Sequence, residues 1–101
     1  MNIKSMRRLR QELKELRRNF APQPAATLEY YASAVGRRRE NRGKEPTWVK
    51  KDDPSLSPPL SIPNHSKDVK AGTARNIIDQ LLADLDEWEI YLTEQENDND
   101  D

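Results

Sequence analysis

The sequence contains no cysteine and only one histidine, His65, among its 101 residues. The absence of cysteine excludes disulfide scaffolds, thiolate metal sites and cysteine nucleophiles. With a single histidine, a multi-histidine zinc site is excluded too, and any metal would have to be held mostly by carboxylates. We therefore expect no metal and no cofactor.

Long apolar runs are also missing. No stretch of about 18 consecutive apolar residues is available to span a bilayer, and the first residues lack the apolar core of a signal peptide. We therefore expect a cytoplasmic protein that does not insert into a membrane.

The chain has few large apolar side chains for its length. It holds 26 Val, Ile, Leu, Met, Phe, Trp and Tyr residues, and charged residues make up 35% of it. A chain of this size forms one domain at most and buries a small core, which excludes a large enzyme. Such a core is marginal by itself, so a protein partner or an oligomer is plausible.

Charge is distributed very unevenly along the chain. Residues 1–51 contain 14 basic and 5 acidic residues, a net charge of +9, whereas residues 52–101 contain 3 basic and 13 acidic residues, a net charge of -10. The basic half could bind nucleic acid, or the two halves could neutralise each other by folding together. Both readings remain open at this point.

The first 20 residues follow a helical pattern. Apolar side chains recur at spacings of three and four, which predicts an amphipathic helix over residues 3–20, ended by Pro22 and Pro24; they are Met6, Leu9, Leu13, Leu16 and Phe20. Basic residues surround this seam and either form a solvated face or contact nucleic acid. Because an isolated helix of this length is marginal in water, we expect the seam to pack on another element or on another copy.

A second, short helix is predicted over residues 25–35, with Gly36 at its C-terminal cap. The densest basic cluster, residues 37–44, follows it. We then expect a short strand at 47–50, a loop at 51–59 rich in Pro, Asp and Ser, and a half-buried strand at 60–62. Pro63 restricts that last strand to an edge or a strand end.

The last helix has the clearest pattern, with apolar residues at spacings of four and three from Ala74 to Leu92. It predicts a long amphipathic helix over residues 73 to about 94, with Thr73 as its N-cap. The outer face is expected to be acidic and to carry Asp79, Asp84, Asp86, Glu87 and Glu89. Acidic residues oppose the helix dipole at this end, so the last turns need tertiary support, which the basic first helix could supply. Residues 96–101 are expected to be an acidic disordered tail.

Residues 60–81 contain a series of motifs in a fixed order. An apolar strand is followed by Pro63 and His65, by Lys67-Asp68 and an apolar residue, by Gly72-Thr73, and by a helix with Ile77 and Gln80. This series resembles the final strand and helix of HicA-type toxins. Upstream, the 25–35 helix, Gly36 and Gly43 also resemble that family, so the likeness covers about residues 25–82.

The resemblance implies an α+β fold in which a small α-β-β-β-α domain, similar to a double-stranded-RNA-binding domain, spans residues 25–95. The basic helix within residues 1–20 and the long C-terminal helix would be additions to it. The family binds or cleaves RNA and is neutralised by a partner antitoxin. Where the family has Gly-Ser-His, this chain has Gly43-Lys44-Glu45, so the catalytic histidine is absent.

Catalysis is therefore doubtful, and endoribonuclease activity stays an open question. RNA cleavage needs a base for the 2′-hydroxyl proton, and histidine suits that role. Glu45, flanked by cations, would be a poor base, and His65 corresponds to a different histidine of the family. Both remain weak catalytic candidates. A single histidine such as His65 is more often a turn residue than a catalyst.

Two functions are compatible with these features. The first is RNA binding by a HicA-type protein, with phosphates held by the basic cluster and a base stacked on its aromatic neighbour; the expected set is Arg37, Arg38, Arg39, Arg42, Lys44, Trp48 and Lys67. The second is a helical interaction module in which the basic and acidic helices pair within one chain or form a homodimer. A solvated loop is the alternative reading of the basic cluster.

Overall fold

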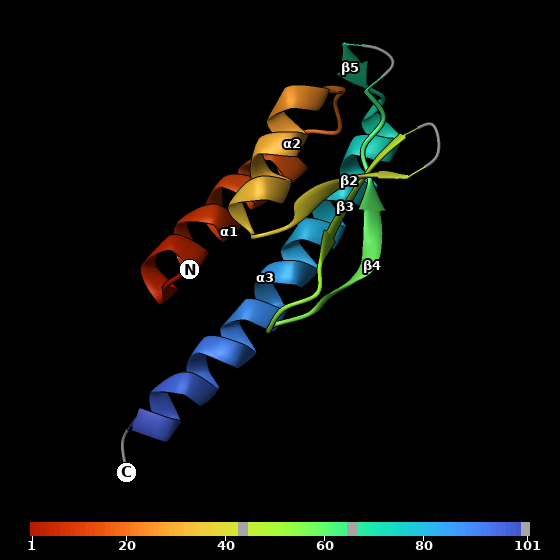
Figure 1. The fold of residues 1–101 in the computed structure, drawn as a ribbon. Helices are drawn as coiled ribbons and strands as arrows, with labels where there is room; N and C mark the ends of the chain where they lie inside the picture. Colours follow the sequence, from red (N-terminus) through yellow and green to blue (C-terminus); the bar gives the residue numbers. More distant parts are fainter. Residues whose placement is uncertain (43–44, 65–66, 100–101) are drawn as a thin grey trace.

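The computed structural model describes residues 1–42, 45–64 and 67–99. Over these residues the fold contains three helices and two antiparallel sheets (Figure 1). The helices are α1 (Ile3–Arg18), α2 (Ala25–Ala34) and α3 (Ala71–Asn99); the larger sheet comprises β2 (Arg38–Arg42), β3 (Glu45–Lys50) and β4 (Leu56–Ser61), and the smaller one β1 (Gln23–Pro24) and β5 (Asp68–Val69). The predicted α+β class is confirmed, and the order from α2 to α3 is helix, three strands of the larger sheet, the short strand β5 of the smaller sheet, and helix.

Helix α1 forms where the apolar seam predicts it. The Asn2 side chain caps its start by accepting a hydrogen bond from the Ser5 backbone N–H at 2.8 Å, and the basic last turn suits the helix dipole. The seam residues Met6, Leu9 and Leu13 are at most 2% exposed. The apolar seam is therefore buried at these three residues, whereas Leu16 is half-buried and Phe20 is 65% exposed.

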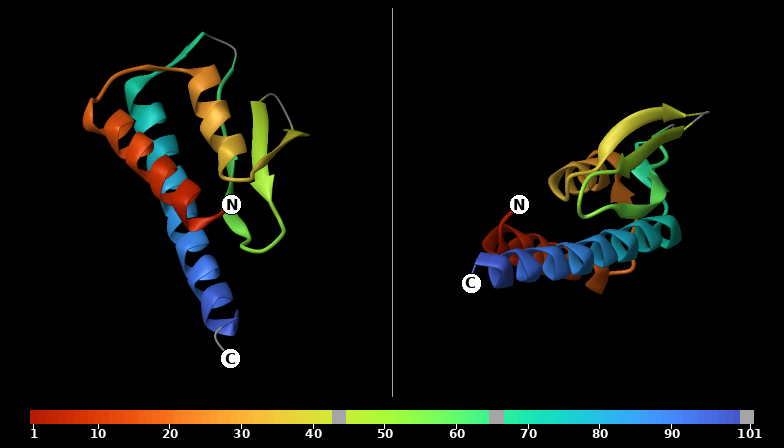
Figure 2. Two further views of the ribbon diagram at one scale, coloured as in Figure 1. Left: turned by 90° about the vertical axis from the view of Figure 1, so that its left-hand side faces the viewer. Right: turned by 60° about the horizontal axis from the view of Figure 1, so that its bottom comes forward.

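Helix α1 packs against α3, and the two run antiparallel (Figure 2). Arg17 near the end of α1 pairs with Asp79 near the start of α3, while Arg10 pairs with Asp86 and Glu89 further along at 3.0 and 3.1 Å. The expected support of the acidic helix by the basic one is thus confirmed, and the pairing occurs within a single chain.

The larger sheet has the order β2-β3-β4, with β3 in the centre. Trp48 of β3 lies opposite Leu60 of β4, and both belong to the core. The helices lie on this same side of the sheet (Figure 2). One face of the sheet therefore packs on the helical layer. Strand β2 is an edge strand, because β3 is its neighbour on one side and no described strand pairs with the other side.

The loop predicted over residues 51–59 is wrong in its second half, because β4 begins at Leu56. Pro58 and Pro59 lie within the strand, where proline lacks the N–H that a sheet interior needs. Strand β4 pairs only with β3, so its outer edge requires no such donor, and the pairing with β3 is irregular between Leu56 and Leu60, where the two prolines lie. Burial of Leu56 and Leu60 fixes the strand despite its two prolines.

Helix α3 is longer than its sequence pattern suggests. It starts at Ala71, and the Ala74 N–H donates to the Lys70 carbonyl at 2.8 Å. Thr73 therefore lies inside the helix and is not its N-cap. It continues to Asn99, which corrects the disordered tail expected over 96–101; Asp100 and Asp101 lie outside the described residues. No glycine or proline follows Gly72 to end the helix.

Within the described residues, no helix has the length and apolar character needed to cross a membrane.

Candidate nucleic-acid interface

Arg37 is buried, which corrects its predicted place in the RNA-binding set. Its side chain is enclosed, with the residue 2% exposed. The Nε and Nη2 atoms donate to Asp84 at 2.7 and 2.9 Å, and Nη1 donates to the carbonyls of Trp48 and Pro58. All three nitrogen atoms of the guanidinium therefore donate hydrogen bonds inside the protein. Arg37 is a structural residue and does not reach a phosphate.

Asp84 is likewise buried, at 1% exposure, and does not lie on the outer acidic face where we expected it. The helical register explains this position, since Asp84 is three residues after Leu81 and four before Trp88, both of which are core residues. A carboxylate on an apolar face needs a charged partner, and Arg37 supplies it.

Trp48 cannot act as the stacking platform that the sequence suggested. It is 8% exposed and packs in the core with Leu60 opposite it on β4. Within the described part of the chain, its indole Nε1 has no hydrogen-bond partner. Burial of a large aromatic ring outweighs the loss of that one hydrogen bond.

Arg38 and Arg39 retain their predicted place at the surface. Both are exposed, and neither has an ion-pair partner among the described residues. They are consecutive in the edge strand β2, opposite Val49 and Trp48 of β3, so their side chains leave the two faces of the sheet at its edge. We call this pair the sheet-edge cations.

The other predicted residues are more scattered. Lys67 is exposed just before β5, and its carbonyl accepts a hydrogen bond from the Ala25 N–H at 3.1 Å. Arg42 ends β2 opposite Glu45, which is half-buried at the start of β3. Lys44 and His65 lie outside the described residues. Among the residues that the structure does describe, no group of three or more His, Asp or Glu side chains could hold a metal ion.

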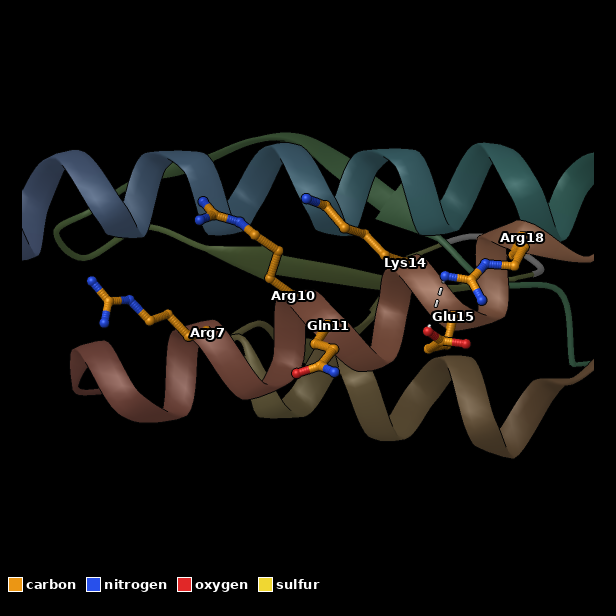
Figure 3. A pocket seen from close by; sticks show the side chains of 6 residues that line it. All are labelled: Arg7, Arg10, Gln11, Lys14, Glu15 and Arg18. Carbon is orange, nitrogen blue, oxygen red and sulfur yellow. Dashed lines mark ion pairs between the residues drawn. The ribbon is translucent and has the colours of Figure 1, made fainter.

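A second cationic surface, not included in the predicted set, lies on α1. A hollow of about 390 Å³ follows this helix (Figure 3) and is lined by Arg7, Arg10, Gln11, Lys14, Glu15 and Arg18. Gln11 and Glu15 extend from the side of α1 opposite Arg10 and Lys14 (Figure 3). The positions 7, 11, 14 and 18 repeat at helical spacing, which is the sequence signal for this surface.

The charges in the hollow are unequally compensated. Arg10 is held by Asp86 and Glu89 of α3, and Arg18 pairs with Glu15 at 3.1 Å. Arg7 and Lys14 are exposed and have no ion pair among the described residues. Four cations and one carboxylate therefore line the hollow.

A further hollow, of about 460 Å³, lies where the start of α1 meets Gly36, Lys50 and Trp88. The Lys50 ammonium lies 5.0 Å from the centre of the Trp88 ring and also donates to the carbonyls of Asp52 and Asp53. The Trp88 Nε1–H donates to the Val35 carbonyl at 2.7 Å. These polar groups already have partners inside the chain, so the hollow offers little for binding a ligand.

Comparison with known proteins finds no relative: no family model, no curated protein and no solved structure matches this chain.

Proposed function

We propose that this protein binds RNA through exposed cations and that its α2–α3 segment is a HicA-type domain. The observation that carries the proposal is the pair Arg38 and Arg39, consecutive, exposed and without ion-pair partners among the described residues, on the edge strand of the sheet. Cations in this state can neutralise phosphates without first breaking an internal contact.

The order of the elements supports the HicA-type assignment. The segment runs α2-β2-β3-β4-β5-α3, and α2 and α3 lie on one side of the three-stranded antiparallel sheet β2-β3-β4, as in a double-stranded-RNA-binding domain. The two-residue strand β5 lies outside that sheet and pairs with β1. The residues that carry the resemblance occur at element boundaries: Pro63 follows β4, Lys67 precedes β5 and Gly72 lies in the first turn of α3. A protein antitoxin that covers the same cations would compete with RNA.

The proposed function is binding, without an assigned catalytic residue. The resemblance leaves Glu45 where the family has its catalytic histidine, and the chain has no second histidine to replace it. The helical interaction module is less favoured in its homodimer form, because α1 packs on α3 within one chain and the seam residues Met6, Leu9 and Leu13 are already buried there.

The test is RNA binding by the purified chain, with Arg38→Ala/Arg39→Ala compared against the control Lys51→Ala/Lys70→Ala. Lys51 and Lys70 are also exposed, so both variants lose two surface charges. We expect the arginine variant to bind several-fold more weakly and its slope of log affinity against log salt to fall by about two. Equal affinity of the two variants would contradict the proposed site, and cleaved RNA on the same gel would contradict binding without catalysis.

A further inference from the structure

We propose that α1 forms a second RNA-binding site, separate from the sheet edge, that takes the phosphate backbone of double-stranded RNA. The site is the hollow lined by Arg7, Gln11, Lys14 and their neighbours (Figure 3). The inference deepens the proposed function and rests on it, since it names the class of RNA bound and a surface outside the HicA-like segment.

The polar face of α1 is held rigidly in place. Met6, Leu9 and Leu13 anchor the opposite face in the core, and the Arg10 and Arg17 ion pairs to α3 fix the rotation of the helix about its axis. A surface that is already ordered loses little conformational entropy when a ligand binds. The helix backbone that carries the cations of α1 is therefore preorganised.

The cationic row has a length that suits a nucleic-acid backbone. From Arg7 to Arg18 the helix rises by about 16 Å, at about 1.5 Å for each residue. A duplex carries one negative charge for about every 1.7 Å of its axis when both strands are counted, so a row of this length can face several phosphates. The unpaired Arg7 and Lys14 can bind them directly, and Arg18 can exchange Glu15 for a phosphate.

The hollow favours a duplex over a single strand, because none of the described residues that line it is aromatic. Single-strand sites combine cations with aromatic rings on which bases stack. Trp48 is buried, and the exposed Phe20 ring beyond the end of α1 has the Arg75 guanidinium 5.7 Å from its centre. Duplex RNA, in contrast, is recognised mainly through its phosphates and 2′-hydroxyls.

Gln11 gives the site a means to distinguish RNA from DNA. Its side chain is exposed and lines the hollow on the side of α1 opposite Arg10 and Lys14 (Figure 3). A side-chain amide both donates and accepts hydrogen bonds, as does a ribose 2′-hydroxyl, which DNA lacks. We assign Gln11 to that contact.

An anionic lipid surface is the competing ligand for a basic helix, but the fold disfavours it. Helices that lie in a membrane interface bury their apolar face among the lipids. In this chain that face is buried against the protein, with Leu13 at 0% exposure. Only the charged face of α1 is available, and it can contact a soluble polyanion without unfolding.

The experiment measures binding of the full chain to a short RNA duplex, to a single strand of one of its sequences and to the DNA duplex of the same sequence. The variant Arg7→Ala/Lys14→Ala/Arg18→Ala removes the row. It should bind duplex RNA at least about tenfold more weakly, with the salt slope smaller by about three. Gln11→Leu should lower the affinity for duplex RNA several-fold and leave the affinity for duplex DNA unchanged.

A gain of affinity provides the matched control. Glu15→Gln removes the one carboxylate that lines the hollow and releases Arg18. This variant should bind duplex RNA several-fold more tightly than the unchanged chain. A variant that merely disturbed folding would not do so.

The outcomes separate this inference from the proposed function. If Arg38→Ala/Arg39→Ala weakens RNA binding but the α1 variant binds duplex RNA like the unchanged chain, the proposed function stands and the second site is wrong. If the unchanged chain binds neither form of RNA, both are wrong. Tighter binding to the single strand than to the duplex, or to anionic lipid vesicles than to either RNA, would also overturn the inference.

Discussion

Arg37 at the α2–β2 junction and Asp84 on α3 form a two-point ion pair in the core, although 47 residues separate them in the chain. The same guanidinium donates to carbonyls of β3 and β4, at 2.7 Å to Trp48 and 3.0 Å to Pro58. One side chain therefore joins the last helix to two strands of the sheet. Arg38 and Arg39, its immediate neighbours in sequence, are in contrast exposed and form the surface that we propose for RNA binding.

Breaking that pair should destabilise the protein strongly. We expect Arg37→Ala or Asp84→Ala to lower the free energy of unfolding by about 3–5 kcal/mol, because each leaves a charge buried without its partner. Chemical denaturation measures the change. If Arg37→Ala left stability unchanged while RNA affinity fell, Arg37 would belong to the binding surface and our assignment would be wrong.

The two glycines Gly36 and Gly72 should respond oppositely to alanine. Gly36 has φ of +101°, and an added Cβ would lie 3.0 Å from Lys50 Cε. We expect Gly36→Ala to cost about 1–3 kcal/mol. Gly72 lies in the first turn of α3 with nothing within 4 Å of an added Cβ, so Gly72→Ala should stabilise by about 0.4–1 kcal/mol. Thermal denaturation of both variants tests the pair, and a stabilising Gly36→Ala would refute the conformation assigned to that residue.

Packing of α1 on α3 predicts a large effect of Leu13→Ala. Leu13 is 0% exposed, and truncation of a fully buried leucine costs about 2–5 kcal/mol. Phe20, 65% exposed beyond the end of the same helix, provides the control, and Phe20→Ala should cost less than about 1 kcal/mol. Similar losses for the two variants in denaturant titrations would mean that α1 does not pack as described.

Stability should decrease in strong base through Tyr31. Burial raises the pKa of the Tyr31 hydroxyl above its ordinary value of 10.0, with Glu12 and Tyr30 adding to the effect. The folded chain therefore holds this proton more tightly than the unfolded one. The corresponding stability is fully present below about pH 10 and is lost as pH rises through the pKa of the folded state. Denaturation at several pH values should show a smaller loss above pH 10 in Tyr31→Phe, and equal losses in both proteins would contradict the assignment.

The helices could be predicted from sequence because apolar periodicity directly reports which face is buried. Met6, Leu9 and Leu13 specify α1, and the stripe through Leu81 and Leu85 specifies α3. Only the end of strand β4 could be predicted, at residues 60–61, since Pro58 and Pro59 argue against a strand before them and are tolerated through its edge position and its irregular pairing with β3. The preferences of residues for strand or loop do not show whether a strand will lie at the edge of a sheet or between two neighbours.

The site was harder to predict than the fold. Residues 37–39 are three consecutive arginines, which the sequence alone does not distinguish. The turn at Gly36 directs the side chain of Arg37 into the core. One signal existed, because Asp84 lies on the apolar face of its helix and an acid there requires a buried cation. The heptad-like spacing of Arg7, Gln11, Lys14 and Arg18 likewise indicated a continuous polar face on α1.

The central claim is that exposed cations bind RNA, and the most direct measurement is the RNA affinity of the full chain at about 50 mM and about 200 mM salt. The unchanged chain should bind at the lower salt concentration and lose affinity steeply at the higher one, and Arg38→Ala/Arg39→Ala should show weaker binding and a shallower salt dependence. Absence of binding at the lower salt concentration, or binding that salt does not change, would contradict the account.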